Sequence, residues 1–157
     1  MSEPIGLSKK AYVAFEGERW NAFIDLLSTA RPDETTPVQR VAFRAWVYSS
    51  EVLNGGHEQY FGNQQDLNHV EVIDNLKTLG AHCQSDVLAS AFSFESMAQT
   101  SMPEGYEAYV SWDEEYGYSE KLRVFDLDFY RCRPEIETEL LQRYLDVNES
   151  EFIKWKP

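Results

Sequence analysis

The chain has 157 residues, of which 43% are hydrophobic and 14% aromatic, a composition typical of a folded domain and not of a disordered chain. It holds 27 Asp and Glu against 14 Lys and Arg, and the net charge of -13 is the wrong sign for a protein that binds nucleic acid directly. No stretch approaches the roughly 18 apolar residues of a membrane span, and residues 1–7 lack the apolar run of a signal peptide. We therefore expect one cytoplasmic domain over residues 1–157, with residues 1–7 as a flexible tail.

The two cysteines, Cys83 and Cys132, lie far apart in sequence and have no metal-ligand spacing. Because disulfides are rare in the cytoplasm, we expect both residues to be reduced thiols in the core. No metal or other cofactor is expected.

Capping signals and helical periodicity predict the first three helices. Ser8 is placed to cap a helix that runs to about Glu16. A second helix starts at Glu18 and shows an apolar stripe at i, i+3, i+4 and i+7, formed by Trp20, Phe23, Ile24 and Leu27. The start of the third helix combines a capping box with a proline at the first helical position, in the segment Thr36, Pro37, Val38 and Gln39.

The segment from Glu51 to Asn63 contains an Asn-Gly-Gly sequence and then two adjacent aromatic residues. Glycine accepts the left-handed conformation that ends many helices, because it has no Cβ. We expect this turn to end the third helix near Leu53 and to return the aromatic pair to the core. The structural residues are therefore Asn54, Gly55, Gly56, Tyr60 and Phe61.

Three more segments of the second half have helical periodicity. The first is capped by Asn68 and ends at Gly80, with its inward residues expected at Val70, Ile73, Leu76 and Leu79. The second starts at Ser85, and the last starts near Pro134 and is followed by a final turn capped by Asn148. Residues 103–133 fit helix or loop, because Gly105 and Gly117 weaken a helix. Since no sustained period-two alternation appears, the expected fold is an all-α bundle of about seven helices.

The dipeptide His57-Glu58 begins like a helical zinc-protease motif, but the position of its second histidine is Phe61. We expect no catalytic and no metal-binding residue. A metal-dependent enzyme that uses Glu51, His57 and Glu58 is the alternative.

The acidic residues are concentrated in the second half of the chain, and no Lys or Arg occurs between Lys77 and Lys121. Duplex DNA carries one charge per about 3.4 Å of axis on each strand. Side chains at i and i+4 of a helix lie about 6 Å apart along its axis, so carboxylates on helix faces approximate a row of phosphates. The candidate partner-binding carboxylates are Glu104, Glu107, Asp113, Glu114, Glu115, Glu120, Asp126, Asp128, Glu135 and Glu139. The pattern leaves open the alternative of a solvated face that only confers solubility, with some of the set paired to neighbouring arginines.

The motif Glu51-Val52-x-Asn54-Gly55-Gly56-x-x-Gln59-Tyr60-Phe61-x-Asn63 resembles the core motif of the bacterial DNA-mimic family. The closing pattern Tyr144-Leu145-x-x-Asn148-x-x-x-Phe152 is similar to the C-terminal pattern of that family, and the resemblance covers roughly residues 20–155. It implies an all-α domain without known catalysis. For the characterised acidic member it implies a dimer whose negative surface imitates duplex DNA and occupies a transcription factor.

Together, the charge pattern and the resemblance predict an acidic protein-interaction protein. Its expected partner is a basic DNA-binding protein, namely a transcription factor, a nucleoid protein or a nuclease. We expect no direct nucleic-acid binding and no membrane, and the resemblance implies a homodimer. An immunity-type or antitoxin-type inhibitor of a basic nuclease or toxin is an alternative that uses the same acidic surface.

Overall fold

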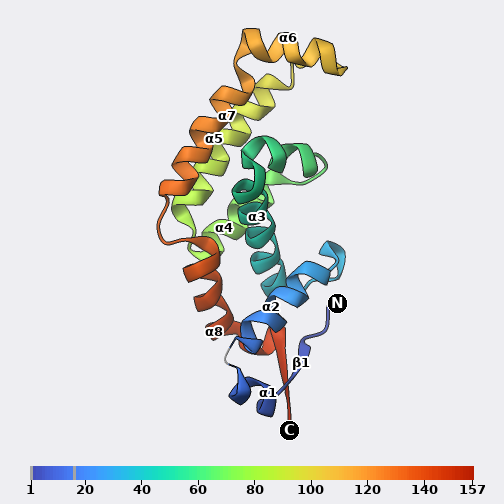
Figure 1. Ribbon diagram of the computed structural model, residues 1–157, viewed down its shortest axis with the longest axis vertical. Helices are drawn as coiled ribbons and strands as arrows, with labels where there is room; N and C mark the ends of the chain where they lie inside the picture. The colour runs from blue at the N-terminus through green and yellow to red at the C-terminus, as the bar shows by residue number, and fades with distance from the viewer. Residues whose placement is uncertain (1, 16) are drawn as a thin grey trace.

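The computed structural model describes residues 2–15 and 17–157 of the chain. The elements in chain order are β1 (Ile5–Ser8), α1 (Lys9–Ala14), α2 (Glu18–Thr29), the 3₁₀ turn η1 (Pro32–Glu34), α3 (Pro37–Asn63), α4 (His69–Leu79), α5 (His82–Ala98), α6 (Tyr106–Tyr116), α7 (Tyr118–Arg131), the π-helix η2 (Ile136–Leu140), α8 (Leu141–Phe152) and β2 (Ile153–Lys156). The predicted all-α bundle is confirmed. The molecule is elongated, with α6 at one end and β1, α1 and β2 at the other (Figure 1).

A small parallel sheet joins the two ends of the chain. β1 pairs with β2 in a register that places Ile5 opposite Ile153 and Leu7 opposite Trp155. Leu7 is buried in the core. The prediction of a flexible tail at residues 1–7 is therefore wrong for residues 5–7, while Met1 lies outside the described residues. β2, with the sequence Ile-Lys-Trp-Lys, alternates over only four residues, so the chain shows no sustained alternation that would predict a sheet.

The predicted helix starts at Ser8 and Thr36 are confirmed by their capping hydrogen bonds. The Ser8 hydroxyl accepts from the backbone N–H of Lys10 at 3.2 Å. At α3, the Thr36 hydroxyl accepts from the backbone of Gln39, whose side chain accepts in return from the Thr36 N–H. The predicted end of the first helix, Glu16, lies outside the described residues.

Helix α4 confirms its predicted caps and corrects its predicted face. The Asn68 side chain accepts from the Glu71 N–H, and Gly80 ends the helix with a φ of 93°. However, Val70 is 57% exposed, whereas Val72 is fully buried. The other three predicted inward residues, Ile73, Leu76 and Leu79, are buried, so the prediction is wrong only at Val70, whose place Val72 takes. Helix α5 also starts three residues earlier than predicted, at His82.

The Asn-Gly-Gly segment kinks α3 instead of ending it. Gly55 and Gly56 have non-helical backbone angles, with φ of -153° and 74°, and the helix resumes at once and continues to Asn63. Tyr60 and Phe61 then face the core, as predicted, with exposures of 0% and 4%. The kink, and not a chain reversal, directs these aromatic side chains inward.

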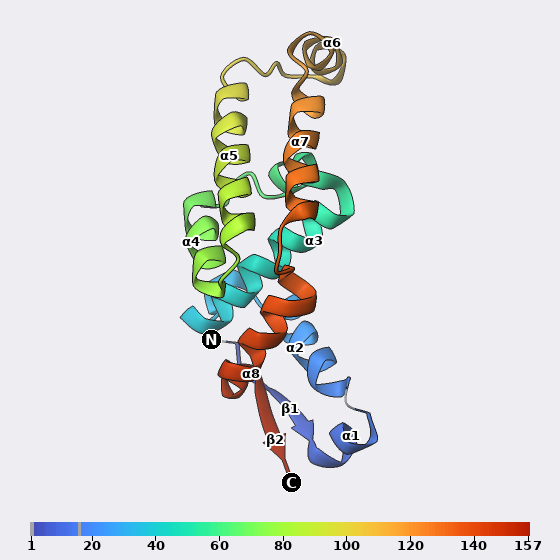
Figure 2. The same cartoon turned by 90° about the vertical axis from the view of Figure 1, so that its left-hand side faces the viewer.

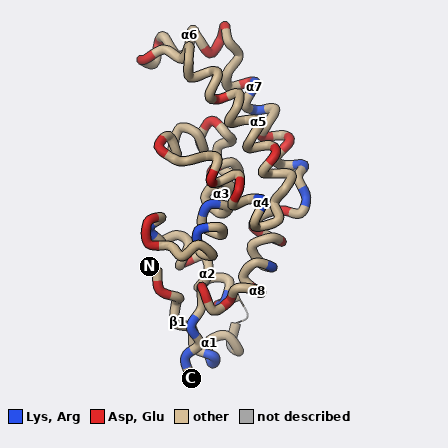
Figure 3. The backbone as a smooth tube through the Cα atoms, turned by 180° about the vertical axis from the view of Figure 1, so that it is seen from behind, with Lys and Arg blue, Asp and Glu red and all other residues tan. Residues whose placement is uncertain are grey.

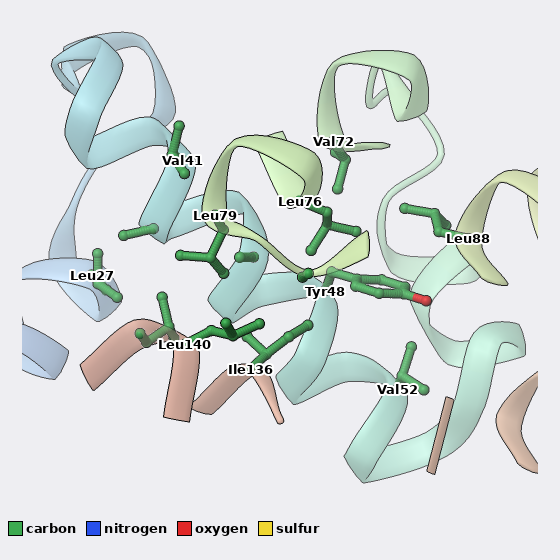
Figure 4. Close-up of a cluster of buried hydrophobic side chains, with 14 of the residues drawn as sticks. Leu27, Val41, Tyr48, Val52, Val72, Leu76, Leu79, Leu88, Ile136 and Leu140 are labelled. Carbon is green, nitrogen blue, oxygen red and sulfur yellow. The ribbon is translucent and has the colours of Figure 1, made fainter. Parts of the chain in front are cut away.

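The core surrounds α3 (Figure 4). Tyr48 is fully buried at its centre, with the rings of Tyr60 and Phe129 packed edge-on at 5.0 and 5.5 Å. Leucine and isoleucine side chains from the surrounding helices complete the cluster, among them Leu27, Leu76, Leu88, Ile136 and Leu140.

Helices α5 and α7 run side by side in opposite directions (Figure 2), which brings the start of α5 to the end of α7. Cys83 and Cys132 lie at these two ends and form a disulfide, with their Cα atoms 5.5 Å apart. The prediction of reduced core thiols is therefore wrong. The separation of 49 residues concealed the pairing, because only the antiparallel packing of two helices brings the thiols together.

The last predicted helix consists of two elements. Its first turn is the π-helix η2, and α8 follows directly. Asn148 does not cap a final turn. It lies at a kink inside α8, where its side-chain amide donates to the Tyr144 carbonyl at 3.0 Å.

Candidate protein-binding surface

Helix α6 lies across the end of the α5–α7 pair (Figure 2). Gly117, with a φ of 70°, is the single residue between α6 and α7, so the chain turns sharply from one helix into the next. This resolves part of the segment that fitted either helix or loop: residues 106–116 and 118–131 are helical. Glu104 lies before the helix, so it does not share a helical face with Glu107.

An aromatic stripe holds α6 in place. Tyr109, Trp112 and Tyr116 recur at i, i+3 and i+7 and therefore share one face. The Trp112 ring stacks on that of Tyr116 with centroids 4.9 Å apart, and it lies 5.4 Å from the ring of Tyr118 on α7. Most aromatic side chains of α6 are thus engaged in packing, while Tyr106 remains 82% exposed.

Two tyrosine hydroxyls connect this aromatic cluster to carboxylates. Tyr118 donates to the buried carboxylate of Glu95 at 2.6 Å, and burial together with this hydrogen bond raises the pKa of Tyr118 well above its ordinary value. Tyr109 donates to Glu58 at 2.8 Å. Burial, and to a smaller extent this hydrogen bond, raises the pKa of Tyr109 to about 12. Both phenols therefore stay protonated donors at neutral pH.

The face of α6 opposite the aromatic stripe is acidic. Glu107 and Glu114 are separated by seven residues, about two helical turns, so they lie on one face, and that face points away from the stripe. Five carboxylates at this end of the molecule are exposed. Among the described residues, none forms a salt bridge with them and no side chain donates a hydrogen bond to them. We call them the α6 acidic surface: Glu104, Glu107, Glu114, Glu115 and Glu120.

The other five predicted carboxylates are engaged elsewhere. Asp113 accepts from the backbone N–H and hydroxyl of Ser119, both at 2.8 Å. Three more lie close to arginines: Asp128 to Arg131 at 3.6 Å, Glu135 to Arg133 at 3.3 Å and Glu139 to Arg143 at 3.4 Å. The last, Asp126, faces the interior.

Asp126 holds His57 at the kink of α3. One of its carboxylate oxygens lies 2.6 Å from His57 Nδ1 and also accepts the His57 backbone N–H at 2.8 Å. The other ring nitrogen, Nε2, lies 2.9 Å from the Tyr48 hydroxyl, and His57 is completely buried. Sequence reasoning missed this link, because Asp126 lies 69 residues from His57.

The three residues of the enzyme alternative have different partners. Glu51 accepts from the side chains of Gln59 and Asn63, at 2.7 and 2.9 Å, whereas Glu58 accepts from Tyr109. They do not converge with His57 on one point. Across residues 2–15 and 17–157, no group of three or more His, Cys, Asp or Glu side chains is arranged to hold a metal ion.

Four exposed lysines gather at the opposite end of the molecule. β1, α1 and β2 contain no acidic residue, and their exposed lysines are Lys9, Lys10, Lys154 and Lys156. Figure 3 shows the two ends, red without blue over α6 and blue around the C-terminus. In the sequence, Lys9 and Lys10 lie near one end of the chain and Lys154 and Lys156 near the other, and the pairing of β1 with β2 brings the two pairs together.

Residues 33–148 match the family model described as DMP19-like protein. The chain belongs to the DMP19-like family. The matched region runs from α3 to most of α8, so it includes the kinked helix and the α6 acidic surface. It does not include β1, α1, α2 or β2. The membership is consistent with the DNA-mimic resemblance of the Asn-Gly-Gly motif.

Comparison of this DMP19-like chain with curated proteins and with solved structures gave no match. In the described part of the chain, no helix is both long enough and apolar enough to cross a membrane.

Proposed function

We propose that this DMP19-like protein is an acidic interaction protein that occupies the DNA-binding surface of a basic protein through its α6 acidic surface. The observation that carries the proposal is the two-sided character of α6. One face is fixed to the fold by aromatic packing, and the other presents carboxylates that no described cation neutralises.

The spacing of these carboxylates suits contact with the Lys and Arg side chains by which a partner protein binds DNA phosphates. Glu107 and Glu114 are about 10.5 Å apart along the helix axis at 1.5 Å per residue. That distance is close to the rise of three base pairs, about 3.4 Å each, along the axis of duplex DNA. A groove lined by Lys and Arg, evolved to hold phosphates, would thus meet carboxylates at a commensurate spacing.

The electrostatics favour fast capture of such a partner. A net charge of -13, together with five exposed carboxylates that form no salt bridge with a described residue, gives the α6 end a strongly negative field. Fields of this kind raise the association rate with an oppositely charged partner and suppress binding to acidic ones. A transcription factor, a nucleoid protein and a nuclease are partners of the required chemistry, and inhibition of a nuclease by an immunity-type protein would use the same physics.

The proposal gives His57 a structural role and no catalytic one. Both of its ring nitrogens are engaged, one by Asp126 and the other by Tyr48, and the ring is fully buried.

The experiment is an affinity capture from a native lysate at low salt, with the wild-type protein as bait. Elution with duplex DNA should release a basic DNA-binding protein, because DNA competes for the same surface, and elution with salt should release it as well. A matched bait carries Glu107→Gln, Glu114→Gln and Glu115→Gln, which remove charge and keep shape. It should retain little of the partner.

The control bait carries Asp128→Asn, Glu135→Gln and Glu139→Gln. It loses the same number of charges, but from carboxylates that lie beside arginines. Equal loss of the partner from both variant baits would mean that net charge alone, and not the α6 acidic surface, governs binding, and the proposal would fail.

A further inference from the structure

A small cavity lies on the side of the molecule away from α6, where four segments meet. It has a volume of about 170 Å³ and lies between the first half of α3, the start of α5, the end of α7 and the segment that leads into η2. Its apolar walls include Phe129, Tyr130 and Ile136.

Gln84 lines this cavity and is 98% buried, with a relative exposure of 2%. Its amide nitrogen donates to the carbonyl oxygen of Pro134 at 2.7 Å. A carbonyl accepts and cannot donate, so this bond fixes which end of the amide is oxygen. The remaining atom, Oε1, is buried and has no hydrogen-bond partner. An unsatisfied buried acceptor of this kind is rare in folded proteins and indicates a missing donor.

The charged groups of the cavity leave one carboxylate free. Arg133 pairs with Glu135 at 3.3 Å and also donates to two backbone carbonyls, so its charge is engaged. Glu137 accepts only from the Ser50 hydroxyl, at 3.3 Å, and forms no salt bridge within the described chain. The lining therefore offers acceptors and negative charge, next to the aromatic rings of Phe129 and Tyr130.

From these contacts we infer that the cavity is a binding site for a small organic cation, an alkylammonium group. The ammonium donates to Gln84 Oε1 and to the Glu137 carboxylate, and its alkyl part lies against the apolar wall. Aromatic rings add attraction, because a cation within about 6 Å of a ring face is stabilised by the ring quadrupole.

The size of the cavity and the backbone around it agree with this assignment. A water molecule takes about 30 Å³ of liquid, so the cavity holds a group of about five or six such volumes. That is the size of a butylammonium ion or of the end of a lysine side chain. Glu137 lies on η2, and π-helical turns occur frequently at functional sites.

The test is an NMR titration of the full chain with n-butylammonium chloride, with 1-butanol as a neutral probe of the same heavy-atom count. We expect saturable shifts of the Gln84 side-chain amide and of Ile136 with butylammonium only. The variant Glu137→Gln keeps the shape of the side chain and should weaken binding at least about tenfold, since a charge-assisted hydrogen bond becomes a neutral one.

The matched control is Glu139→Gln, which lies on the same π-helix but does not line the cavity. It should bind butylammonium as the wild type does. A second arm uses N-acetyl-lysine methylamide. Tighter binding than butylammonium assigns the ligand to a lysine of a partner protein, and weaker binding assigns it to a free amine.

Three results would overturn the inference. The first is the absence of saturable shifts with butylammonium. The second is a crystal structure, from a crystal soaked in the amine, in which an ordered water alone satisfies Gln84 Oε1. The third is equal affinity of Glu137→Gln and the wild type for butylammonium, which would show that the Glu137 charge does not bind the ammonium.

Discussion

Replacement of Gly56 by alanine is predicted to destabilise the protein far more than replacement of Gly55, although the two glycines are neighbours. Gly56 has a φ of 74°, the left-handed region, and a Cβ built there collides with the Asp126 carboxylate. Gly55 has a φ of -153°, outside the left-handed region, and its Cβ would meet only the side chain of Gln59. The amide of Gln59 can move aside, but Gln59 Cβ, 2.9 Å from the added Cβ, requires a small backbone shift.

The magnitude for Gly56→Ala has two parts. The left-handed conformation costs about 1–2 kcal/mol for a residue with a Cβ. Displacement of Asp126 leaves the backbone N–H and Nδ1 of the buried His57 without their acceptor, which costs about 1–3 kcal/mol more. The sum of about 2–5 kcal/mol is a large share of the 5–15 kcal/mol that usually stabilises a domain. For Gly55→Ala, where only the contact with Gln59 must adjust, we expect a cost at the low end of overpacking, about 1 kcal/mol.

The assay is urea unfolding followed by far-UV circular dichroism, supported by thermal scans, in which 1 kcal/mol corresponds to about 2–4 °C for a chain of this size. A double-mutant cycle separates the two parts. In an Asp126→Ala background the collision is absent, so Gly56→Ala should cost only about 1–2 kcal/mol. Equal stability of the Gly55→Ala and Gly56→Ala proteins would refute the account of the kink.

Three further predictions concern the rest of the fold. Tyr118→Phe removes the donor to the buried Glu95 carboxylate and should lower the unfolding free energy by about 1–3 kcal/mol, which urea titration would detect, whereas an unchanged midpoint would contradict the contact. Burial lowers the pKa of His69 below 6.5, so the unfolded state binds more protons as the pH falls below 6.5, and stability should fall with it. His69→Gln should therefore reduce the stability difference between pH 7.5 and pH 5.5, and a variant with the full difference would show that other groups cause it. Reduction of the disulfide between Cys83 and Cys132, which are 49 residues apart, should cost up to about 4 kcal/mol, visible as a lower melting temperature with reductant than without it.

Sequence reasoning succeeded where the signal is local. The cap at Ser8, the capping box at Thr36 and the glycine end at Gly80 depend on residues within one helical turn, and all three are present in the structure. The break at Gly55 and Gly56 is where the sequence predicts it, but it is a kink within α3 and not the predicted end of the helix. The choice between a helix end and a kink depends on whether the next segment finds a core to pack against, and Asp126 on a distant helix helps to decide it.

Features that depend on distant pairing were missed or misassigned. The disulfide, the sheet between β1 and β2, and the inward turn of Asp126 all join segments far apart in the chain. The base-free window predicted where carboxylates gather, yet it did not predict which are free. Asp128 and Glu139 are paired by arginines at i+3 and i+4 on their own helices, a local signal that narrows the set from sequence alone.

The central claim is tested most directly by a titration of the captured basic partner with the wild type and the two triple variants at low and high salt. The account predicts that the Glu107, Glu114 and Glu115 variant binds weakly and with little salt dependence. The variant at the arginine-paired positions Asp128, Glu135 and Glu139 should bind like the wild type. The affinity of both should fall steeply as the salt concentration rises, because salt screens the exposed carboxylates. A wild-type affinity unchanged by salt, or undiminished in the α6 variant, would contradict it.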